Sequence, residues 1–343
     1  MKVLRKLAIP QIIIVICLGL ISFIVINSSF ADMRKHYVND VIENRLQMIN
    51  KEIEVGSRKA VSEASVFVRL PAVMEAYDIA LSGDIDDPYS PQSQKAREFL
   101  RRELAPMLDS HSEITGYKLQ LHFHLPNGLS LARLWREKQT MIDGKWVDIS
   151  DDISSFRPTV MDVNRTGKIV MGLEPGSGGF AIRGVVPVTT PEGRQIGSAE
   201  VLQEFNPILE TVNDTGKFFI SLYANKEHLD FSIELRDREK YPAKGDFIRV
   251  VEAKDSSVEA LITAELLKKG REGFFAADHA SMTVAAFPLN DYRGRQTGVM
   301  VCAMNTQAVS RLANTATLIL AIMITGMVIA PLFVLLLRLR RLV

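Results

Sequence analysis

Two long uncharged segments constrain this chain more than any other feature of its sequence. No charged residue occurs from Leu7 to Ala31 or from Leu312 to Leu337. Each segment exceeds the ~20 apolar residues that a helix needs to cross the hydrocarbon core of a bilayer. The sequence therefore predicts transmembrane helices over residues 8–31 and 312–337.

The first segment could instead be a secretory signal. Its apolar core is longer than the ~7 to 15 residues typical of a signal peptide, and no clean small-residue cleavage site follows, so we interpret it as a retained anchor. Basic residues keep their side of a span in the cytoplasm. They flank the outer ends of both spans: Lys2, Arg5 and Lys6, then Arg338, Arg340 and Arg341. We therefore expect a multi-pass inner (cell) membrane protein, with residues 1–7 and 338–343 in the cytoplasm and residues 32–311 periplasmic or extracellular.

The composition of the chain limits what the outer region can be. A chain of 343 residues has room for more than one core, because domains usually contain ~100 to 200 residues. The 41 basic and 40 acidic residues nearly cancel, so no global field would attract nucleic acid. Cys17 and Cys302 both lie in apolar segments, which argues against a disulfide framework and a cysteine zinc site.

A long amphipathic helix is predicted to follow the first span. From Asp32 to about Ala80 there are almost no turn residues, and apolar residues recur at spacings of three, four and seven, as they do on one face of a helix. This spacing suits a parallel dimer as well as packing within the chain. Gly56 on the same face favours packing within the chain. The loop GDIDDPYSP and a second helix over residues 93–108 come next.

Beyond these helices the apolar residues alternate with a period of two, which is typical of strands. In the segment KLQLHFH, the leucines and the phenylalanine share one face while His122 and His124 share the other. Further strands are expected at residues 168–173, 180–188, 196–205, 217–223, 247–251, 273–277, 282–288 and 296–304, with a helix at residues 257–268. Helices that precede antiparallel strands in both halves predict an α+β fold.

An internal repeat indicates that the outer region is duplicated. The residues Pro187, Gly193, Arg194, Gln195 and Gly197 recur as Pro288, Gly294, Arg295, Gln296 and Gly298, each pair 101 positions apart. Five matches in one register do not arise readily by chance. In each predicted hairpin the first glycine supplies a positive φ at the turn, and the second lets the returning strand approach its neighbour closely.

These features together resemble the double Cache sensory domains of bacterial chemoreceptors and sensor kinases. The likeness covers roughly residues 35–310 and is most specific from His122 to Val188, where LHFHLPNGLSLARLWR and FAIRGVVPV are similar to the third double Cache type. The resemblance implies two tandem PAS-like (Cache) antiparallel-sheet units on a long N-terminal helix, flanked by two transmembrane helices. It also implies a homodimer and a ligand pocket in the membrane-distal unit.

The expected domain plan follows from this resemblance. A stalk helix would cover residues 32–80, the membrane-distal unit residues 81–214 and the membrane-proximal unit residues 215–311. In amino-acid-binding relatives an Arg-x-Trp-Tyr motif holds the ligand. The segment Arg133-Leu134-Trp135-Arg136 is similar, with Arg136 where the tyrosine would be.

Basic residues of the first unit could bind an anion. If the leucines of KLQLHFH pack on the long helix, the two histidines face the other side of the sheet, where a PAS-like pocket lies. Guanidinium groups with few acids nearby favour a carboxylate or phosphate, which they bind bidentately. The candidate ligand-binding residues are His122, His124, Arg133, Trp135, Arg136, Arg157 and Arg183. Arg165 lies in the same region, and Trp135 would form an aromatic wall.

Each candidate residue also has an ordinary structural interpretation. A loop arginine usually contacts water or a nearby acid, and Trp135 could simply belong to the core. Two histidines are too few for a structural metal site, and the spacing sets no carboxylate partner. They are therefore interpreted as hydrogen-bonded histidines, and no metal or other cofactor is predicted.

The favoured function is the extracytoplasmic sensing region of a transmembrane receptor that binds a small anion such as an organic acid. The chain ends shortly after the second span, so the cytoplasmic output module is expected outside this chain or in a partner. A membrane-anchored adaptor or structural protein is the main alternative. A periplasmic enzyme is a weaker one, because no G-x-S-x-G, H-E-x-x-H or paired-acid motif is present.

Overall fold

A computed structural model of the chain describes residues 2–176, 179–205, 208–209, 217–230 and 232–340. These residues divide into two compact units by their contacts. The first contains Met1–Arg45, Ala276–Ala285 and Cys302–Val343, and the second contains Leu46–Phe275 and Ala286–Val301. The expected boundary between the two sheet units, at residues 214 and 215, lies outside the described residues.

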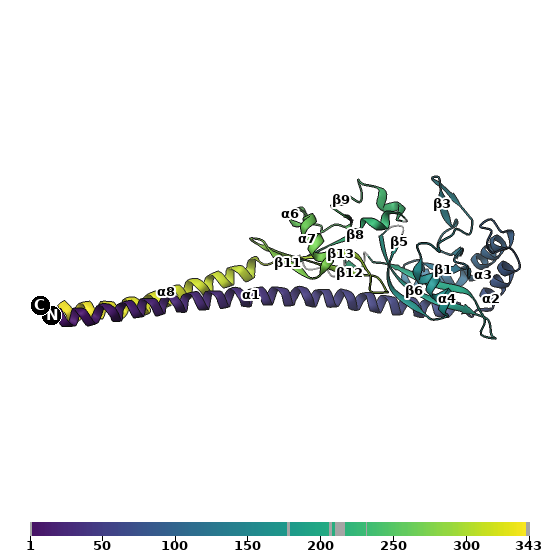
Figure 1. Cartoon of the computed structure of the whole chain (residues 1–343). Coiled ribbons are helices and arrows are strands. Elements are labelled where there is room, and N and C mark those ends of the chain that lie inside the picture. The colour runs from purple at the N-terminus through teal and green to yellow at the C-terminus, as the bar shows by residue number, and fades with distance from the viewer. Residues whose placement is uncertain (1, 177–178, 206–207, 210–216, 231, 341–343) are drawn as a thin grey trace. The chain divides into compact units, whose positions relative to one another are not determined.

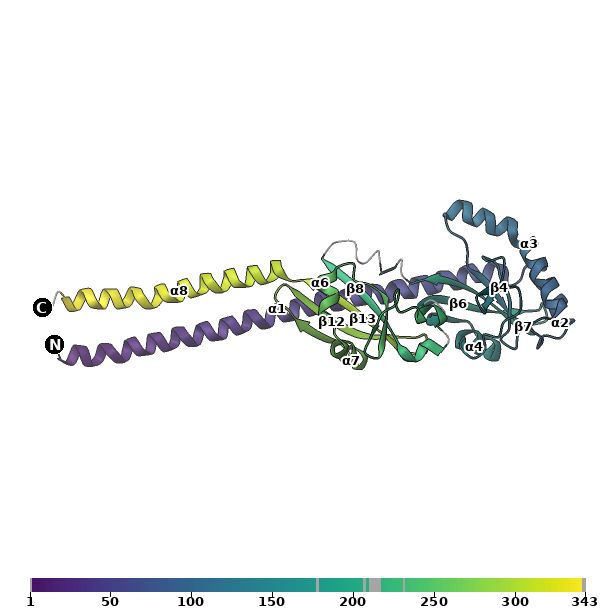
Figure 2. The ribbon, with the colours of Figure 1, turned by 90° about the horizontal axis from the view of Figure 1, so that it is seen from above.

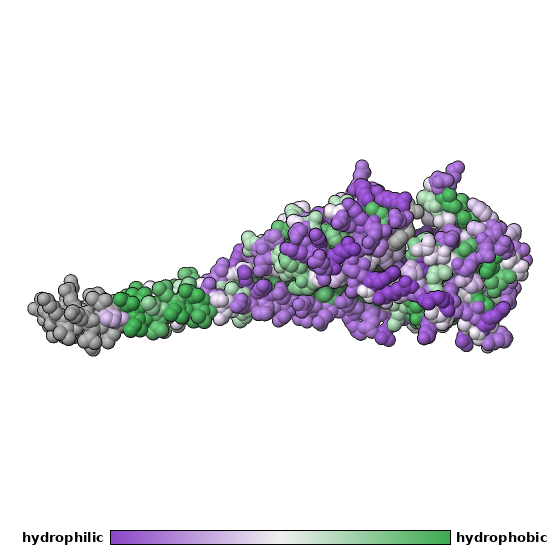
Figure 3. Space-filling view, in the orientation of Figure 1, coloured by the Kyte–Doolittle hydropathy of each residue, from purple (hydrophilic) through white to green (hydrophobic). Residues whose placement is uncertain are grey.

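The first unit holds both candidate membrane helices. Helix α1 (Lys2–Phe67) and helix α8 (Gln307–Arg340) each contain a segment that is long and apolar enough to cross a membrane. They lie side by side and antiparallel in two views (Figures 1 and 2). The side chains of Asn27 and Thr317 are hydrogen-bonded at 3.3 Å. Figure 3 shows the apolar band that these helices expose. The two predicted spans are therefore helical.

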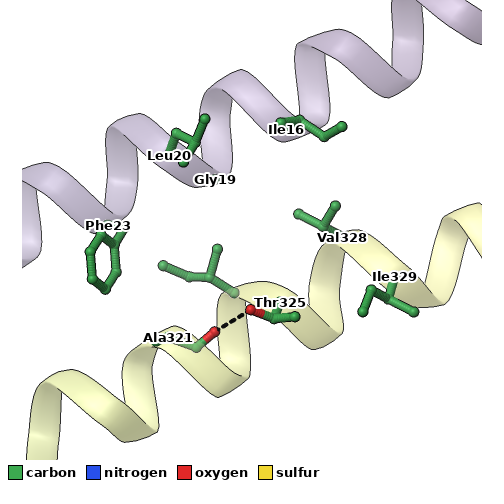
Figure 4. Close-up of a pocket in the computed structure, with 9 residues that line it drawn as sticks. Ile16, Gly19, Leu20, Phe23, Ala321, Thr325, Val328 and Ile329 are labelled. Atoms are coloured by element: carbon green, nitrogen blue, oxygen red, sulfur yellow. Dashed lines mark hydrogen bonds between the residues drawn. The ribbon is translucent and has the colours of Figure 1, made fainter.

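An apolar groove of about 320 Å³ lies between the two candidate membrane helices (Figure 4). Small residues on both helices, Gly19 and Ala321, border it. The one hydroxyl drawn there, on Thr325, donates to the Ala321 carbonyl within its own helix at 2.7 Å. The groove therefore offers packing surface and few polar contacts.

Two prolines divide the helical part of the second unit. The predicted helix over residues 32–80 ends at Phe67, and α2 (Pro71–Leu81) begins with Pro71 at its first position. Proline has no N–H and is best accommodated in the first turn of a helix, so Pro71 favours the start of a new helix at this point. Helix α3 (Pro91–Thr115) also starts with proline and ends at Gly116 with φ of 78°. It extends beyond the predicted residues 93–108.

The sheet of the expected membrane-distal unit, named the distal sheet for that expectation, has five antiparallel strands in the order β2-β1-β7-β6-β5. Its strands are β1 (Leu121–His124), β2 (Ser130–Arg133), β5 (Val170–Gly176), β6 (Gly179–Thr189) and β7 (Gln195–Glu204). A separate hairpin of β3 (Thr140–Ile142) and β4 (Lys145–Val147) and the helix α4 (Pro158–Thr166) complete this part. The sequence did not predict β2, the separate hairpin or α4.

One face of the distal sheet packs on helices α1, α2 and α3. Leu121 and Phe123 belong to this hydrophobic core together with Phe67 of α1. The hydroxyl of Tyr77 on α2 donates to the carbonyls of His124 and Ser198 at 2.9 and 3.0 Å, which fixes α2 to two strands. The apolar residues of KLQLHFH therefore lie in one core with the long helix, which is the condition for the two histidines to face the other side of the sheet.

The sheet of the expected membrane-proximal unit, named the proximal sheet in the same way, has six strands in the order β11-β12-β13-β8-β10-β9. Its strands are β8 (Phe218–Asn225), β9 (Ala243–Lys244), β10 (Phe247–Val251), β11 (Phe275–Asp278), β12 (Met282–Asn290) and β13 (Gln296–Asn305). The helices of this part are η1 (Lys226–Asp230), η2 (Ile233–Arg236), α6 (Ser256–Leu261) and α7 (Ala264–Glu272). The single helix predicted at residues 257–268 is two, because Ile262 is extended and Thr263 caps α7 by accepting from the Leu266 N–H.

The internal repeat corresponds to the β6–β7 and β12–β13 hairpins. Gly193 and Gly294 have φ of 87° and 77° at equivalent turns. The next glycines are crowded: a Cβ on Gly197 would lie 2.5 Å from Tyr77 Cε1, and one on Gly298 2.5 Å from the Tyr223 carbonyl oxygen. The predicted α+β fold with two tandem sheet units is confirmed.

Replacing Gly184 tests how closely α1 and β6 approach. A Cβ at Gly184 would lie 2.6 Å from the backbone carbonyl carbon of Ala60. Because backbone atoms cannot move aside cheaply, Gly184→Ala should lower the free energy of unfolding by about 1–3 kcal/mol. The control Gly273→Ala, with φ of 172° and nothing within 4 Å, should stay within about 0.5 kcal/mol of the wild type. Thermal unfolding of the full chain in nanodiscs measures both, and equal stability of the two variants would contradict this packing.

Candidate ligand-binding site

The face of the distal sheet opposite the helices is lined by buried polar side chains. Residues alternate along β1, so His122 and His124 point away from the hydrophobic core. On the neighbouring strand β7, Glu200 pairs with His122 and Ser198 pairs with His124. These four residues are at most 1% exposed. The predicted orientation of the two histidines is thus correct.

The polar stripe continues across β6 and β5. Arg183 on β6 lies diagonally from Glu200, whose direct partner is Val185. Its Nη1 is 3.2 Å from Glu200 Oε2. Its Nε is 2.9 Å from Oε2 of Glu174 on β5, an ion pair without the alignment of a hydrogen bond. One charged row therefore crosses three strands.

Helix α4 adds Arg157 to this row. The helix packs on β5, β6 and β7, and Arg157 occupies its N-cap position. The Arg157 Nε donates to Glu174 Oε2 at 2.8 Å, and its Nη2 donates to Glu200 Oε2. The backbone N–H and the hydroxyl of Thr159 also donate to Glu174, at 2.9 and 3.0 Å. The Glu174 carboxylate therefore stabilises the positive end of α4.

The buried charges balance one another. Burial opposes ionisation of Glu200, yet Arg157 and Arg183 hold its pKa well below the ordinary value. Burial and the nearby positive groups lower the pKa of His122, so this imidazole is neutral at neutral pH. Two carboxylates therefore face two guanidinium groups. The expectation that few acids accompany these arginines was wrong, because Glu174 and Glu200 pair with them.

Three of the predicted residues lie at the rim of this face. Arg133 forms a bidentate ion pair with Asp151, at 2.6 and 2.9 Å. The ring of Trp135 is edge-on to His122, with centroids 6.0 Å apart. The exposed Arg136 stacks near the rings of Trp135 and Trp146, at 5.4 and 5.3 Å. The structure thus joins His122, His124, Arg157 and Arg183 in one network.

Arg165, which lies in the same region of the sequence as the candidate residues, is not part of this network. Its side chain is 73% exposed and pairs with Asp162 three residues earlier on α4. It therefore has the ordinary role of a surface arginine.

Gln139 is a buried site residue that the sequence did not point to. Its Oε1 accepts from the Arg133 backbone N–H at 2.7 Å. Its side chain is fully buried, and its Nε2 has no hydrogen-bond partner among the described residues. A buried donor without an acceptor costs about 1–3 kcal/mol, so this amide is suited to donate to a bound molecule.

A cleft of about 230 Å³ in the second compact unit is lined by other residues. It is bordered by α1, by Gly172 and Leu173 of β5, and by residues from Phe287 to Tyr292. None of the predicted ligand-binding residues lines it.

Comparison with known proteins gives one family and a set of similar folds. Residues 90–309 match the model of a family described as the double sensory domain of two-component sensor kinases. A search of curated proteins finds no match.

Three solved structures are among those to which this chain is similar. The ligand-binding domain of the Campylobacter jejuni chemoreceptor Tlp3 with L-valine has 11% identity and a TM-score of 0.44, over 81% of this chain and 94% of that one. The V. cholerae DctB histidine kinase sensor domain has 9% identity and a TM-score of 0.40, over 79% and 97%. The Pseudomonas aeruginosa chemoreceptor PctC ligand-binding domain with GABA has 13% and 0.37, over 79% and 98%.

Removing Arg157 tests whether the polar face is one balanced network. Arg157→Met leaves Glu174 and Glu200 with a single guanidinium, and breaking a buried ion pair in this way costs about 3–5 kcal/mol. Arg165→Met on the same helix is the control and should cost less than about 1 kcal/mol. Chemical denaturation of the full chain compares them, and a similar midpoint for both variants would refute the network.

Proposed function

The chain belongs to the family of double sensory domains of two-component sensor kinases, the double Cache domains, and on this premise we propose that it senses a small anionic molecule outside the membrane. The ligand would bind in the membrane-distal unit, on the polar face of the distal sheet. The basic residues flanking both spans support an orientation with this unit periplasmic or extracellular.

The observation that carries this proposal is the unpaired amide of Gln139 beside a face lined with hydrogen-bonding groups. A carboxylate or comparable oxyanion offers acceptors only, and so complements an N–H donor. Because the buried charges already balance, Arg133 and Arg136 at the rim of the face would neutralise the negative charge of the ligand. Arg133 would then exchange Asp151 for the ligand, and Trp135 would cover its apolar part.

Helix α4 offers a route for the signal toward the proximal unit. Its N-cap residue, Arg157, is in the polar network, while Asp162 on its body contacts the proximal β12–β13 turn. Asp162 Oδ2 accepts from Tyr292 Oη at 2.8 Å and from Arg293 Nε at 2.9 Å. Burial opposes ionisation of Asp162, but these bonds and one from Arg165 lower its pKa to about 2. The contact is therefore charged throughout the physiological pH range.

Strand β5 makes a second connection of the same kind. Glu174 belongs to the polar network, and the carbonyl of the preceding Leu173 accepts from the Tyr292 N–H at 2.9 Å. Farther along β5, the Gly176 carbonyl accepts from the Ser232 hydroxyl at 2.7 Å. A ligand that shifts Glu174 would thus act on residues bonded to the proximal unit, from which β13 leads in sequence to α8. Such small displacements of packed elements are a common form of switching.

We further propose that the receptor acts as a homodimer with a cytoplasmic output module. The family description names sensor kinases, so a kinase-type module, on this chain or a partner, is the expected recipient of the signal.

Ligand binding is tested by a thermal-shift screen of the full chain in nanodiscs against organic acids, amino acids and sugars. A ligand at 100 times its dissociation constant should add ~2.7 kcal/mol of stability, and organic acids should supply the hits. Gln139→Leu and Arg133→Ala should each weaken binding of the best hit by at least about tenfold, as expected for one lost charged or buried hydrogen bond of ~1.5–3 kcal/mol.

Arg238→Ala, an exposed arginine of the proximal unit, serves as the control and should bind like the wild type. Unchanged affinity in both site variants, or a sugar as the best hit, would contradict the proposal.

A further inference from the structure

Three potential metal ligands converge at one point of the polar face. They are His122 Nδ1, His124 Nε2 and Glu200 Oε1. His122 Nδ1 lies 3.0 Å from both of the other atoms, and His124 Nε2 lies 3.4 Å from Glu200 Oε1. The three atoms form a nearly equilateral triangle although they come from two strands.

The size of this triangle matches one face of a tetrahedral metal site. Zinc binds histidine nitrogen at ~2.0–2.1 Å and carboxylate oxygen at a similar distance, so neighbouring ligand atoms around it are ~3.3 Å apart. The observed separations of 3.0, 3.0 and 3.4 Å are close to this value. A cation can therefore approach all three atoms with little rearrangement of the side chains.

Hydrogen bonds alone do not satisfy the lone pairs of these three atoms well. A neutral imidazole has one donor and one acceptor nitrogen, and an ionised carboxylate only accepts. Two N–H groups cannot face each other at 3.0 Å, so at most one proton lies between His122 Nδ1 and His124 Nε2. With a proton there, the lone pair of the accepting nitrogen still faces Glu200 Oε1. A cation at the centre removes this repulsion.

The groups around the triangle orient the three ligands as a second layer does in metal sites. His122 Nε2 lies 2.7 Å from the Ser130 hydroxyl, and His124 Nδ1 lies 3.1 Å from the Ser198 hydroxyl. Each hydroxyl can accept the remaining ring proton and so leave the triangle nitrogen free to coordinate. The other carboxylate oxygen of Glu200 accepts from Arg157. Each ligand side chain is therefore held from its far side.

We propose that His122, His124 and Glu200 bind a divalent transition-metal ion of the zinc class. Two imidazoles and one carboxylate suit zinc, nickel or copper and exclude a preference for magnesium or calcium, which take oxygen ligands. Three protein ligands leave the fourth tetrahedral position for water or a bound molecule.

The ion would reach its site from the side of Trp135. This ring is the half-exposed neighbour of His122, with centroids 6.0 Å apart, whereas the ligand atoms themselves are buried. The site goes beyond the organic anion proposed above and does not depend on it, because the metal can be tested alone.

The test is isothermal titration of Zn²⁺, without any organic ligand, into the full chain in nanodiscs and free of a histidine tag. The wild type should bind one Zn²⁺ per chain, with Mg²⁺ giving no heat. His124→Asn should weaken binding by more than a hundredfold. Ser198→Ala should weaken it by about 10- to 100-fold, because it removes only the hydrogen bond to His124 Nδ1 and keeps all three metal ligands. His279→Asn, at an exposed histidine, should bind like the wild type.

Circular dichroism decides whether each variant is folded, and Ser198→Ala keeps the test decisive if His124→Asn unfolds. Absence of saturable binding to the wild type would overturn the metal site. The metal site would also be overturned if Ser198→Ala and His122→Asn were both folded and both bound Zn²⁺ with wild-type affinity. Binding of Zn²⁺ without any organic-acid effect would leave the metal site standing and remove only the anion proposal.

Discussion

Burial of two carboxylates under α4 is the constraint on which the rest of the distal unit depends. Glu174 and Glu200 are at most 1% exposed, and a buried charge without a partner costs several kcal/mol. Arg157 and Arg183 must therefore remain in contact with them, which holds α4, β5, β6 and β7 in one arrangement. The hydrophobic core stabilises one face of the sheet, and the polar network stabilises the other.

The same network is connected to the proximal unit, because α4 and β5 each contain a residue of the buried ion pairs and a residue that contacts the proximal unit. Arg157 and Glu174 belong to the buried ion pairs, and Asp162 and Leu173 contact the turn at Tyr292. A metal ion or anion that altered the pairing of Glu200 would change the balance around Arg157 first. Movement of α4 would then alter the contacts of a turn in the second copy of the repeat.

Local patterns in the sequence were sufficient to predict most of the fold. Alternation of apolar and polar residues predicted the long strands and placed His122 on the sheet face opposite the hydrophobic core. The repeated glycines predicted both hairpins. The end of α1 was missed although Pro71 marks it. The pairing within the site was missed because it is set by strand register: Glu200 lies 78 positions from His122, and no local pattern encodes that contact. The one sequence signal for this pairing was Glu200, an acidic residue among the small and apolar residues of a predicted strand.

The central claim, that the buried network and the proximal turn respond together, is tested most directly by hydrogen exchange. The amide of Tyr292, which donates to Leu173, reports on the connection. Arg157→Lys keeps the charge but loses the planar fork that bonds two carboxylates, so this amide should exchange faster than in the wild type. Arg101→Lys on α3, which disturbs the bidentate pair of Arg101 with Asp148, should leave the exchange of this amide unchanged. Equal exchange of the Tyr292 amide in all three proteins would contradict the account.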